Sequence, residues 1–97
     1  MDKILNNLGL CMRAGQLVVG ENLVIDGIRK GEICYVFLAN DCGQNTNKQV
    51  RDKAKFYNVE ICDSYNSLEL SNAVGKNNKK VLGVKKSGSN FLKILRK

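Results

Sequence analysis

The chain has 97 residues, 43% of them hydrophobic and 26% charged, with a formal net charge of +7 and no histidine. This length predicts a single domain over residues 1–97 with one modest core, and the composition is typical of a folded protein. The missing histidine excludes Ser-His-Asp and Cys-His catalysis and histidine metal ligation. The positive charge favours a polyanionic partner.

The charge is unevenly distributed along the chain. From Leu70 onwards the sequence contains eight Lys or Arg and no acidic residue, whereas the first 69 residues contain eight basic and nine acidic residues. This distribution predicts a basic face on the folded protein. The face is either a plain solvated surface or a contact surface for nucleic acid, and the charges alone do not decide between them.

The cysteines and the apolar runs limit the remaining classes of protein. The sequence contains four cysteines: Cys11, Cys34, Cys42 and Cys62. They have no zinc-ligand spacing, so we expect reduced thiols, no metal or other cofactor, and a cytoplasmic location. Cys42 is the only candidate nucleophile, and without an evident base it makes an enzyme the weakest hypothesis. The longest apolar run, residues 33–39, is far shorter than the roughly 20 residues of a membrane helix, so no membrane role is predicted.

Helical spacing of Ile4, Leu8 and Cys11 predicts a first helix over residues 2–13, ended by Gly15. A short strand over 17–19 follows, and Gly20 turns the chain into a second helix that ends at Gly31. The expected buried side of this helix is formed by Leu23, Val24, Ile25 and Ile28, and its polar side by Asn22, Asp26, Arg29 and Lys30. The continuous apolar run 33–39 predicts a central strand covered on both faces.

The second half of the chain begins with a polar loop over 40–45. The T-x-x-Q pattern from Thr46 then predicts a capping box at the start of a third helix. This helix is expected to turn Val50, Ala54 and Tyr57 inward. Further elements are a strand over 59–62, a helix from an N-cap at Ser67 to Val74, a strand over 81–85, and a terminal helix around Phe91, Leu92 and Leu95. The alternation of strands and helices predicts an α/β fold with a mostly parallel sheet.

The segment 18–31 contains the first candidate binding site. It is predicted to form the end of a strand, a glycine turn and the start of an amphipathic helix. The first N–H groups of a helix have no partner within the helix, and its dipole adds positive potential there, so such a start binds anions. The alternative interpretation is an ordinary surface helix with solvated charges.

Four short stretches resemble a known family. They are L-G-L-C-M-R-A-G-Q-L at 8–17, Gly20-Glu21, residues 38–41 with Asn45-Thr46, and Gly75 before a strand. This pattern resembles the bacterial YlxQ-type ribosomal-protein-like family, which is part of the kink-turn RNA-binding superfamily of large-subunit ribosomal proteins. The resemblance implies a three-layer α/β/α sandwich with a four-stranded mixed sheet. It also implies binding to a kink-turn, a sharply bent duplex with tandem sheared G·A pairs.

The resemblance also implies which residues contact RNA. By position these are the helix residues Gly20, Glu21, Asn22, Leu23, Asp26 and Lys30 and the loop residues Gly75, Lys76, Asn77, Asn78, Lys79 and Lys80. Arg13, with Lys30, is a further candidate for phosphate contact. Two positions depart from the superfamily pattern: Asp26 replaces the lysine of stronger RNA binders, and the loop is polar where theirs is apolar.

These observations support one main hypothesis and one alternative. The main hypothesis is a monomeric, non-catalytic protein that binds a kink-turn or another bent, structured RNA, in ribosomal RNA or messenger RNA, and no DNA. The ribosome is then a further potential partner. The alternative is an adaptor whose basic face binds a protein of the ribosome or of the transcription machinery. For Asn45 and Thr46 we expect a structural cap rather than a ligand contact.

Overall fold

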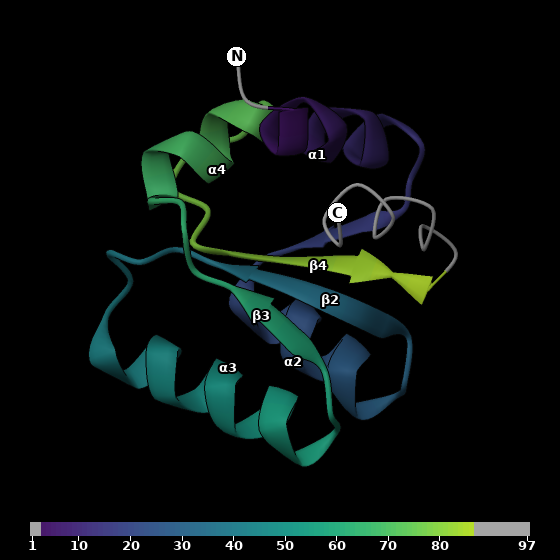
Figure 1. The fold of residues 1–97 in the computed structure, drawn as a ribbon, viewed down its shortest axis with the longest axis vertical. Coiled ribbons are helices and arrows are strands. Elements are labelled where there is room, and N and C mark those ends of the chain that lie inside the picture. Colours follow the sequence, from purple (N-terminus) through teal and green to yellow (C-terminus); the bar gives the residue numbers. More distant parts are fainter. Residues whose placement is uncertain (1–2, 87–97) are drawn as a thin grey trace.

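The computed structural model describes residues 3–86, and the terminal helix expected around Phe91, Leu92 and Leu95 lies outside them. Helices and strands alternate along the chain as the sequence predicts (Figure 1). In chain order the elements are α1 (Lys3–Arg13), β1 (Leu17–Val19), α2 (Glu21–Arg29), β2 (Ile33–Leu38), α3 (Gln44–Phe56), β3 (Glu60–Cys62), α4 (Ser67–Val74) and β4 (Val81–Lys85).

The four strands form a mixed sheet in the order β1-β4-β2-β3. Only β2 and β3 are parallel, whereas β4 runs antiparallel to both of its neighbours. The expectation of a mostly parallel sheet is therefore wrong, and the mixed sheet implied by the family resemblance is confirmed. The reason is that β4 begins beside the end of β2, where the Ala39 N–H donates to the Lys80 carbonyl at 2.8 Å, and so has to run back.

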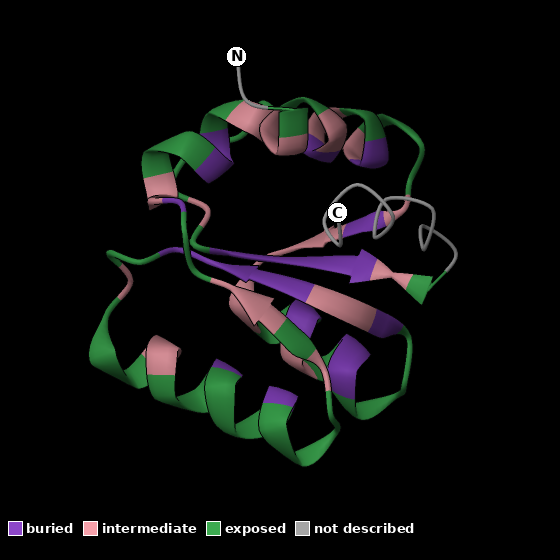
Figure 2. Cartoon of the chain, viewed as in Figure 1, coloured by how far each residue is buried: buried purple, intermediate pink, exposed green. Residues whose placement is uncertain are grey.

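Two helical layers enclose the sheet. α1 and α4 cover one face, and α2 and α3 cover the other (Figure 1). Buried residues follow the inner side of each helix and both faces of the central strands (Figure 2). Along β2, Ile33, Val36 and Leu38 join the core beneath α2 and α3, whereas Phe37 joins the core beneath α1 and α4. The apolar run is thus a strand buried on both faces, as predicted.

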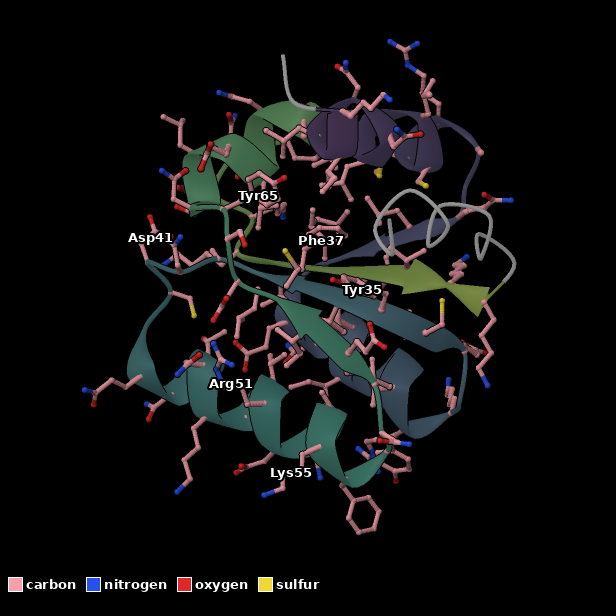
Figure 3. All side chains as sticks on the ribbon, in the orientation of Figure 1. Tyr35, Phe37, Asp41, Arg51, Lys55 and Tyr65 are labelled. Carbon is pink, nitrogen blue, oxygen red and sulfur yellow. The ribbon has the colours of Figure 1, made fainter. Side chains whose placement is uncertain are left out.

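Aromatic rings fill the core between the sheet and the α1–α4 layer (Figure 3). The rings of Tyr35 and Phe37 lie 5.2 Å apart between centroids, and Phe37 lies 6.4 Å from Tyr65. Tyr65 precedes α4, so these contacts hold the start of that helix against the sheet. Within residues 3–86, no helix is long and apolar enough to cross a membrane.

Two side chains expected in the core are exposed. Leu23 of α2 is 63% exposed, and Tyr57, which follows α3, is 41% exposed. In α2 the buried side is formed instead by Val24, Gly27 and Ile28. Gly27 allows close packing, because a Cβ there would lie 2.6 Å from a side-chain carbon of Ile33. The apolar side chain of Leu23 predicts a place in the core, but Leu23 lies outside the stripe of α2 residues that faces the sheet.

Two helix starts differ from the predicted ones. α3 begins after Gly43, so Thr46 is a residue of its first turn and the predicted capping box does not form. α4 is capped by Asn66 rather than Ser67: the Asn66 side chain accepts from the Glu69 N–H at 2.8 Å, and the Asn66 N–H donates to the Glu69 carboxylate at 3.1 Å. This is a capping box displaced by one residue from the predicted N-cap.

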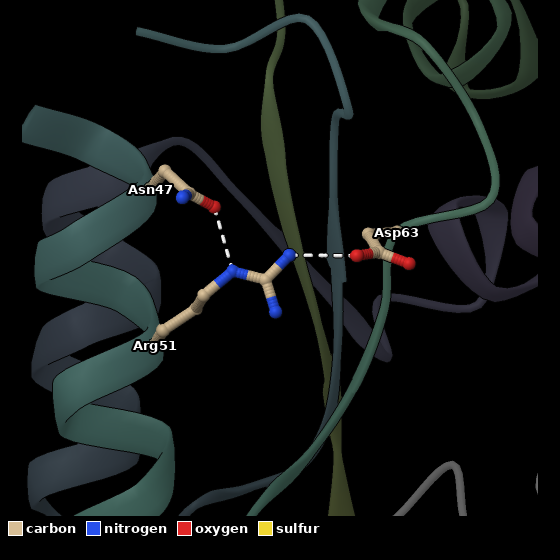
Figure 4. Close-up of polar contacts among 3 residues, drawn as sticks. All are labelled: Asn47, Arg51 and Asp63. Atoms are coloured by element: carbon tan, nitrogen blue, oxygen red, sulfur yellow. Dashed lines mark hydrogen bonds and ion pairs between the residues drawn. The ribbon is translucent and has the colours of Figure 1, made fainter. Parts of the chain in front are cut away.

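Arg51 connects α3 to the end of β3 (Figure 4). Its Nε donates to Asn47 Oδ1 and its Nη2 to Asp63 Oδ2, both at 2.7 Å. These exposed contacts fix the guanidinium at the edge of the sheet. Arg51 is therefore occupied within the protein.

Candidate nucleic-acid interface

Several loops meet at the end of the sheet where β1 and β2 stop and β4 begins. There the Gly20 N–H donates to the Val81 carbonyl at 2.9 Å, which joins the start of α2 to the segment before β4. Between these segments lies an open cleft of about 490 Å³, which we call the loop cleft. It is lined by Gly20, Glu21, Thr46, Asn78, Lys79, Lys80 and Val81.

Gly20 shapes one side of the loop cleft through its backbone. It is the N-cap of α2, with φ 107° and ψ 146°, and no side chain caps the helix. A Cβ at this position would meet no atom within 4 Å, so the glycine is required by backbone conformation and not by space. The first N–H groups of α2 are left without a side-chain cap beside the cleft, where the helix dipole favours negative charge.

The residues after Gly20 differ in how firmly they are held. The Glu21 carboxylate accepts a hydrogen bond from the Thr46 hydroxyl at 2.8 Å. Asn22 and Leu23 are exposed and lie next to Glu21 on the first turn of α2. Thr46 is thus a residue of the cleft, whereas its local sequence predicts only a helix cap. No local pattern indicates this contact, because it joins two helices across 25 positions.

The loop over 75–80 is anchored near its end, at Lys79, by Ser71 of α4. The Ser71 hydroxyl accepts from the Lys79 N–H at 2.8 Å and donates to the Lys79 carbonyl at 3.1 Å. Ser71 is 4% exposed and is the only buried polar residue among those described. Its role was not predicted, since a serine within an amphipathic helix gives no sequence signal for a long-range contact.

The loop presents a second side toward α4. Lys76, Asn77 and Asn78 line a hollow of about 420 Å³ together with residues of α4. Gly75 ends α4 in the left-handed conformation, and Asn78 also has a positive φ of 54°. Only the second half of the loop, from Asn78 to Lys80, lines the loop cleft.

Asp41 connects another loop of this region to the start of α4. Its carboxylate accepts from the Ser67 N–H at 2.8 Å and from the Ser67 hydroxyl at 2.9 Å. These hydrogen bonds hold the pKa of Asp41 below its ordinary value, because they stabilise the charged carboxylate. Figure 3 shows Asp41 at the loop-rich edge of the molecule.

Lys30 and Arg13, the two predicted phosphate contacts, lie away from the loop cleft. Both lie toward the opposite end of β4, where the Lys85 N–H donates to the Gln16 carbonyl and the Lys86 N–H to the Glu32 carbonyl. Arg13 ends α1, which belongs to the other helical layer (Figure 1). The structure therefore does not unite all the predicted residues in one site.

Asp26 and Lys30 form an exposed ion pair one turn apart on α2, with 3.0 Å between Lys30 Nζ and Asp26 Oδ2. The hydrogen bond and the charge of Asp26, together with the charge of Glu32, raise the pKa of Lys30. Lys30 thus remains a cation, but its nearest neighbour is a carboxylate. This arrangement offsets the attraction of Lys30 for phosphate.

Two of the four thiols, Cys11 and Cys42, are made less acidic by their surroundings. Burial raises the pKa of Cys11 and of Cys42, which lowers the fraction of reactive thiolate near neutral pH. Among residues 3–86 no group of cysteine and acidic side chains is arranged to hold a metal ion. Neither of these two cysteines lines the loop cleft.

The α/β fold is that of a ribosomal-protein-like class. Comparison with known proteins identifies the family. The sequence profile of the ribosomal protein L7Ae/L30e/S12e/Gadd45 family matches residues 2–93, and the chain belongs to this family. The chain is 41% identical over 86 residues to a protein of Enterococcus faecium named RNA-binding protein YlxQ, covering 89% of this chain and 82% of that relative. It is 37% identical over 81 residues to the protein of the same name in Bacillus subtilis (strain 168), covering 84% and 81%.

Solved structures confirm the fold. A protein with unknown function from Bacillus halodurans C superposes with a TM-score of 0.90 at 32% identity, with complete coverage of both chains. A 15.5kD RNA binding protein of Giardia lamblia superposes with a TM-score of 0.79 over 98% of this chain and 86% of its own. At 12% identity this second likeness concerns the fold alone.

Proposed function

We propose that this protein is a non-catalytic RNA-binding protein that recognises a kink-turn or a similarly bent, structured RNA at the loop cleft. The observation that carries the proposal is that the Gly20–Glu21 turn lines the same cleft as Lys79 and Lys80. Two bacterial relatives bear the name RNA-binding protein YlxQ, which supports the same class of ligand.

The groups around the cleft suit an irregular RNA. The uncapped N–H groups of α2 donate to phosphate or to base edges, and the exposed Asn22 side chain offers both a donor and an acceptor. Thr46 orients the Glu21 carboxylate, which accepts a base N–H. A kinked backbone exposes base edges that a regular A-form groove hides, and Lys79 and Lys80 add attraction for phosphate.

A gel-shift or filter assay with a short kink-turn RNA and a matched regular duplex tests this proposal. Lys79→Glu with Lys80→Glu is expected to weaken kink-turn binding by about 30-fold or more at moderate salt, because two phosphate contacts become repulsive. Asn22→Ala is expected to weaken it by about tenfold. The matched control is Lys53→Glu with Lys55→Glu, which makes the same charge change on exposed positions of α3. Equal retention of both RNAs by the unaltered protein contradicts the proposal.

Asp26 provides a second test on the same helix. Asp26→Lys removes the partner of Lys30 and adds a cation, so kink-turn binding is expected to become about five- to tenfold tighter, with a steeper dependence on salt. A salt titration of both proteins measures both effects. An unchanged affinity and salt slope would place this part of α2 outside the RNA contact.

The adaptor remains a second candidate. The observations that favour it are the Asp26–Lys30 pair and the polar loop over 75–80, which both weaken the attraction for standard kink-turn RNA. Nuclease treatment of a pull-down separates the two functions. Partners that survive the treatment favour the adaptor, and partners lost with the RNA favour RNA binding.

A further inference from the structure

The outer side of α1 carries an exposed leucine that the core does not use. Lys3, Asn6, Leu10 and Arg13 are exposed at spacings of three and four residues and form one stripe, whereas the buried residues of α1 lie on the other side of the helix. Leu10 is 59% exposed within this otherwise polar stripe. Its side chain therefore contributes little to folding and is available to a partner.

Leu10 borders a groove of about 670 Å³ between α1 and α4, which we call the helix groove. The lining includes the apolar residues Leu5, Gly9, Leu10 and Ala73. The two helices approach closely at Gly9, where an added Cβ would lie 2.9 Å from the Ala73 carbonyl oxygen. The open volume of the groove leaves room for a side chain of a partner beside Leu10.

Two charged residues line the helix groove, and only one of them is available. The Glu69 carboxylate accepts the Asn66 N–H and so is part of the α4 cap. The Arg13 guanidinium has no hydrogen bond or ion pair with residues 3–86. Among residues 3–86, the groove thus combines apolar residues and two asparagines with one cation, Arg13, that has no carboxylate partner. This is too little positive charge for an RNA backbone but enough to pair with one carboxylate.

We propose that the helix groove binds the apolar face of an amphipathic helix from a protein partner, with an Asp or Glu of that helix paired to Arg13. A helix presents apolar anchors at three- and four-residue spacing, which fits a groove between two helices. Residues 87–97 contain no Asp or Glu, so this segment does not supply the acidic side chain that the proposal requires. Because α1 and α2 cover opposite faces of the sheet, this partner and RNA can be bound together (Figure 1).

Photocrosslinking of the full-length protein in its own cells tests the proposal. Leu10→p-benzoylphenylalanine is expected to crosslink to a protein segment whose sequence, read by mass spectrometry, has apolar residues at helical spacing and an adjacent Asp or Glu. Leu68→p-benzoylphenylalanine is the control, because Leu68 is 67% exposed on α4 but does not line the helix groove. Arg13→Glu, introduced together with Leu10→p-benzoylphenylalanine, is expected to reduce the yield of the crosslinked product about fivefold.

A synthetic peptide of the crosslinked segment completes the test. Leu10→Ser is expected to weaken its binding about tenfold, and replacing its carboxylate by lysine is expected to restore binding to the Arg13→Glu protein. Leu10→Ser is expected to leave the affinity for kink-turn RNA unchanged. A failure of this proposal can therefore be distinguished from a failure of the RNA-binding proposal. A crosslink to RNA, to residues 87–97 or to a second copy of the protein overturns the proposal. The absence of any crosslink, or a crosslink whose yield Arg13→Glu does not change, overturns it as well.

Discussion

The loop cleft and the helix groove are two open surfaces built in opposite ways. The cleft is formed by segments from three parts of the chain, joined by hydrogen bonds, and its charged residues are Glu21, Lys79 and Lys80. The groove is formed by two packed helices and presents apolar side chains beside Arg13, which has no ion pair with residues 3–86. A surface that depends on backbone geometry is sensitive to changes in φ or in an anchoring hydrogen bond, whereas a packed groove is sensitive to side-chain size and charge.

The largest effect on stability is expected from Ser71→Ala. The substitution removes both hydrogen bonds to Lys79, and leaving these backbone groups without partners costs about 1–3 kcal/mol of stability. RNA affinity is expected to fall several-fold, because the loop over 75–80 loses its anchor. Denaturant unfolding and the kink-turn assay measure the two effects, with Ser64→Ala at an exposed bend as the control. Unchanged RNA affinity in the destabilised variant would show that the anchor does not shape the cleft.

A smaller effect is expected from Gly20→Ala. The added methyl meets no atom, so the cost of about 1–2 kcal/mol arises from the backbone conformation alone. Gly31→Ala is the matched control, since Gly31 has an equally open position and a positive φ of 74° but lies at the other end of α2. Both variants are expected to lose stability in denaturant unfolding. Only Gly20→Ala is expected to weaken RNA binding, and equal losses would contradict a role of the α2 start.

The smallest effect concerns pH. Hydrogen bonds from Ser67 lower the pKa of Asp41 in the folded protein. The Asp41 carboxylate therefore contributes fully to stability above its ordinary pKa of about 4, and this contribution is lost as the pH falls through the lowered pKa of the folded state. Asp41→Asn is therefore expected to flatten the pH dependence of stability below about pH 4. Urea unfolding at several pH values measures this, with Asp52→Asn on the exposed side of α3 as the control. An identical pH profile for Asp41→Asn and the unaltered protein would contradict it.

The sequence predicted most elements because their patterns are local. The strand predicted over residues 81–85 has the same bounds as β4, and Gly75 ends α4 as expected. The errors arise where a contact crosses the chain. Thr46 was assigned to a cap because a local pattern allows it, but its hydroxyl binds Glu21. The direction of β4 was missed because alternation of elements does not specify where a strand begins.

The candidate site was predicted only in part for the same reason. Family resemblance selected Gly20, Glu21 and the loop over 75–80, and in the structure Gly20 and Glu21 share one cleft with residues 78–80. It also selected Lys30, which is paired with Asp26 at the far end of α2. Ser71 was not selected, because a buried serine in a helix looks like any other small residue until its long-range partner is known.

The sequence alone therefore determined the α/β class, the positions of the strands and helices, the family and the basic character of the C-terminal part, because periodicity, charge and short motifs are encoded along the chain. The tertiary structure decided which loops form the cleft, which charges are paired and which apolar residues remain exposed. These properties depend on contacts between distant segments, as in the hydrogen bonds of Thr46 to Glu21 and of Ser71 to Lys79. Local propensities carry no information about such pairs.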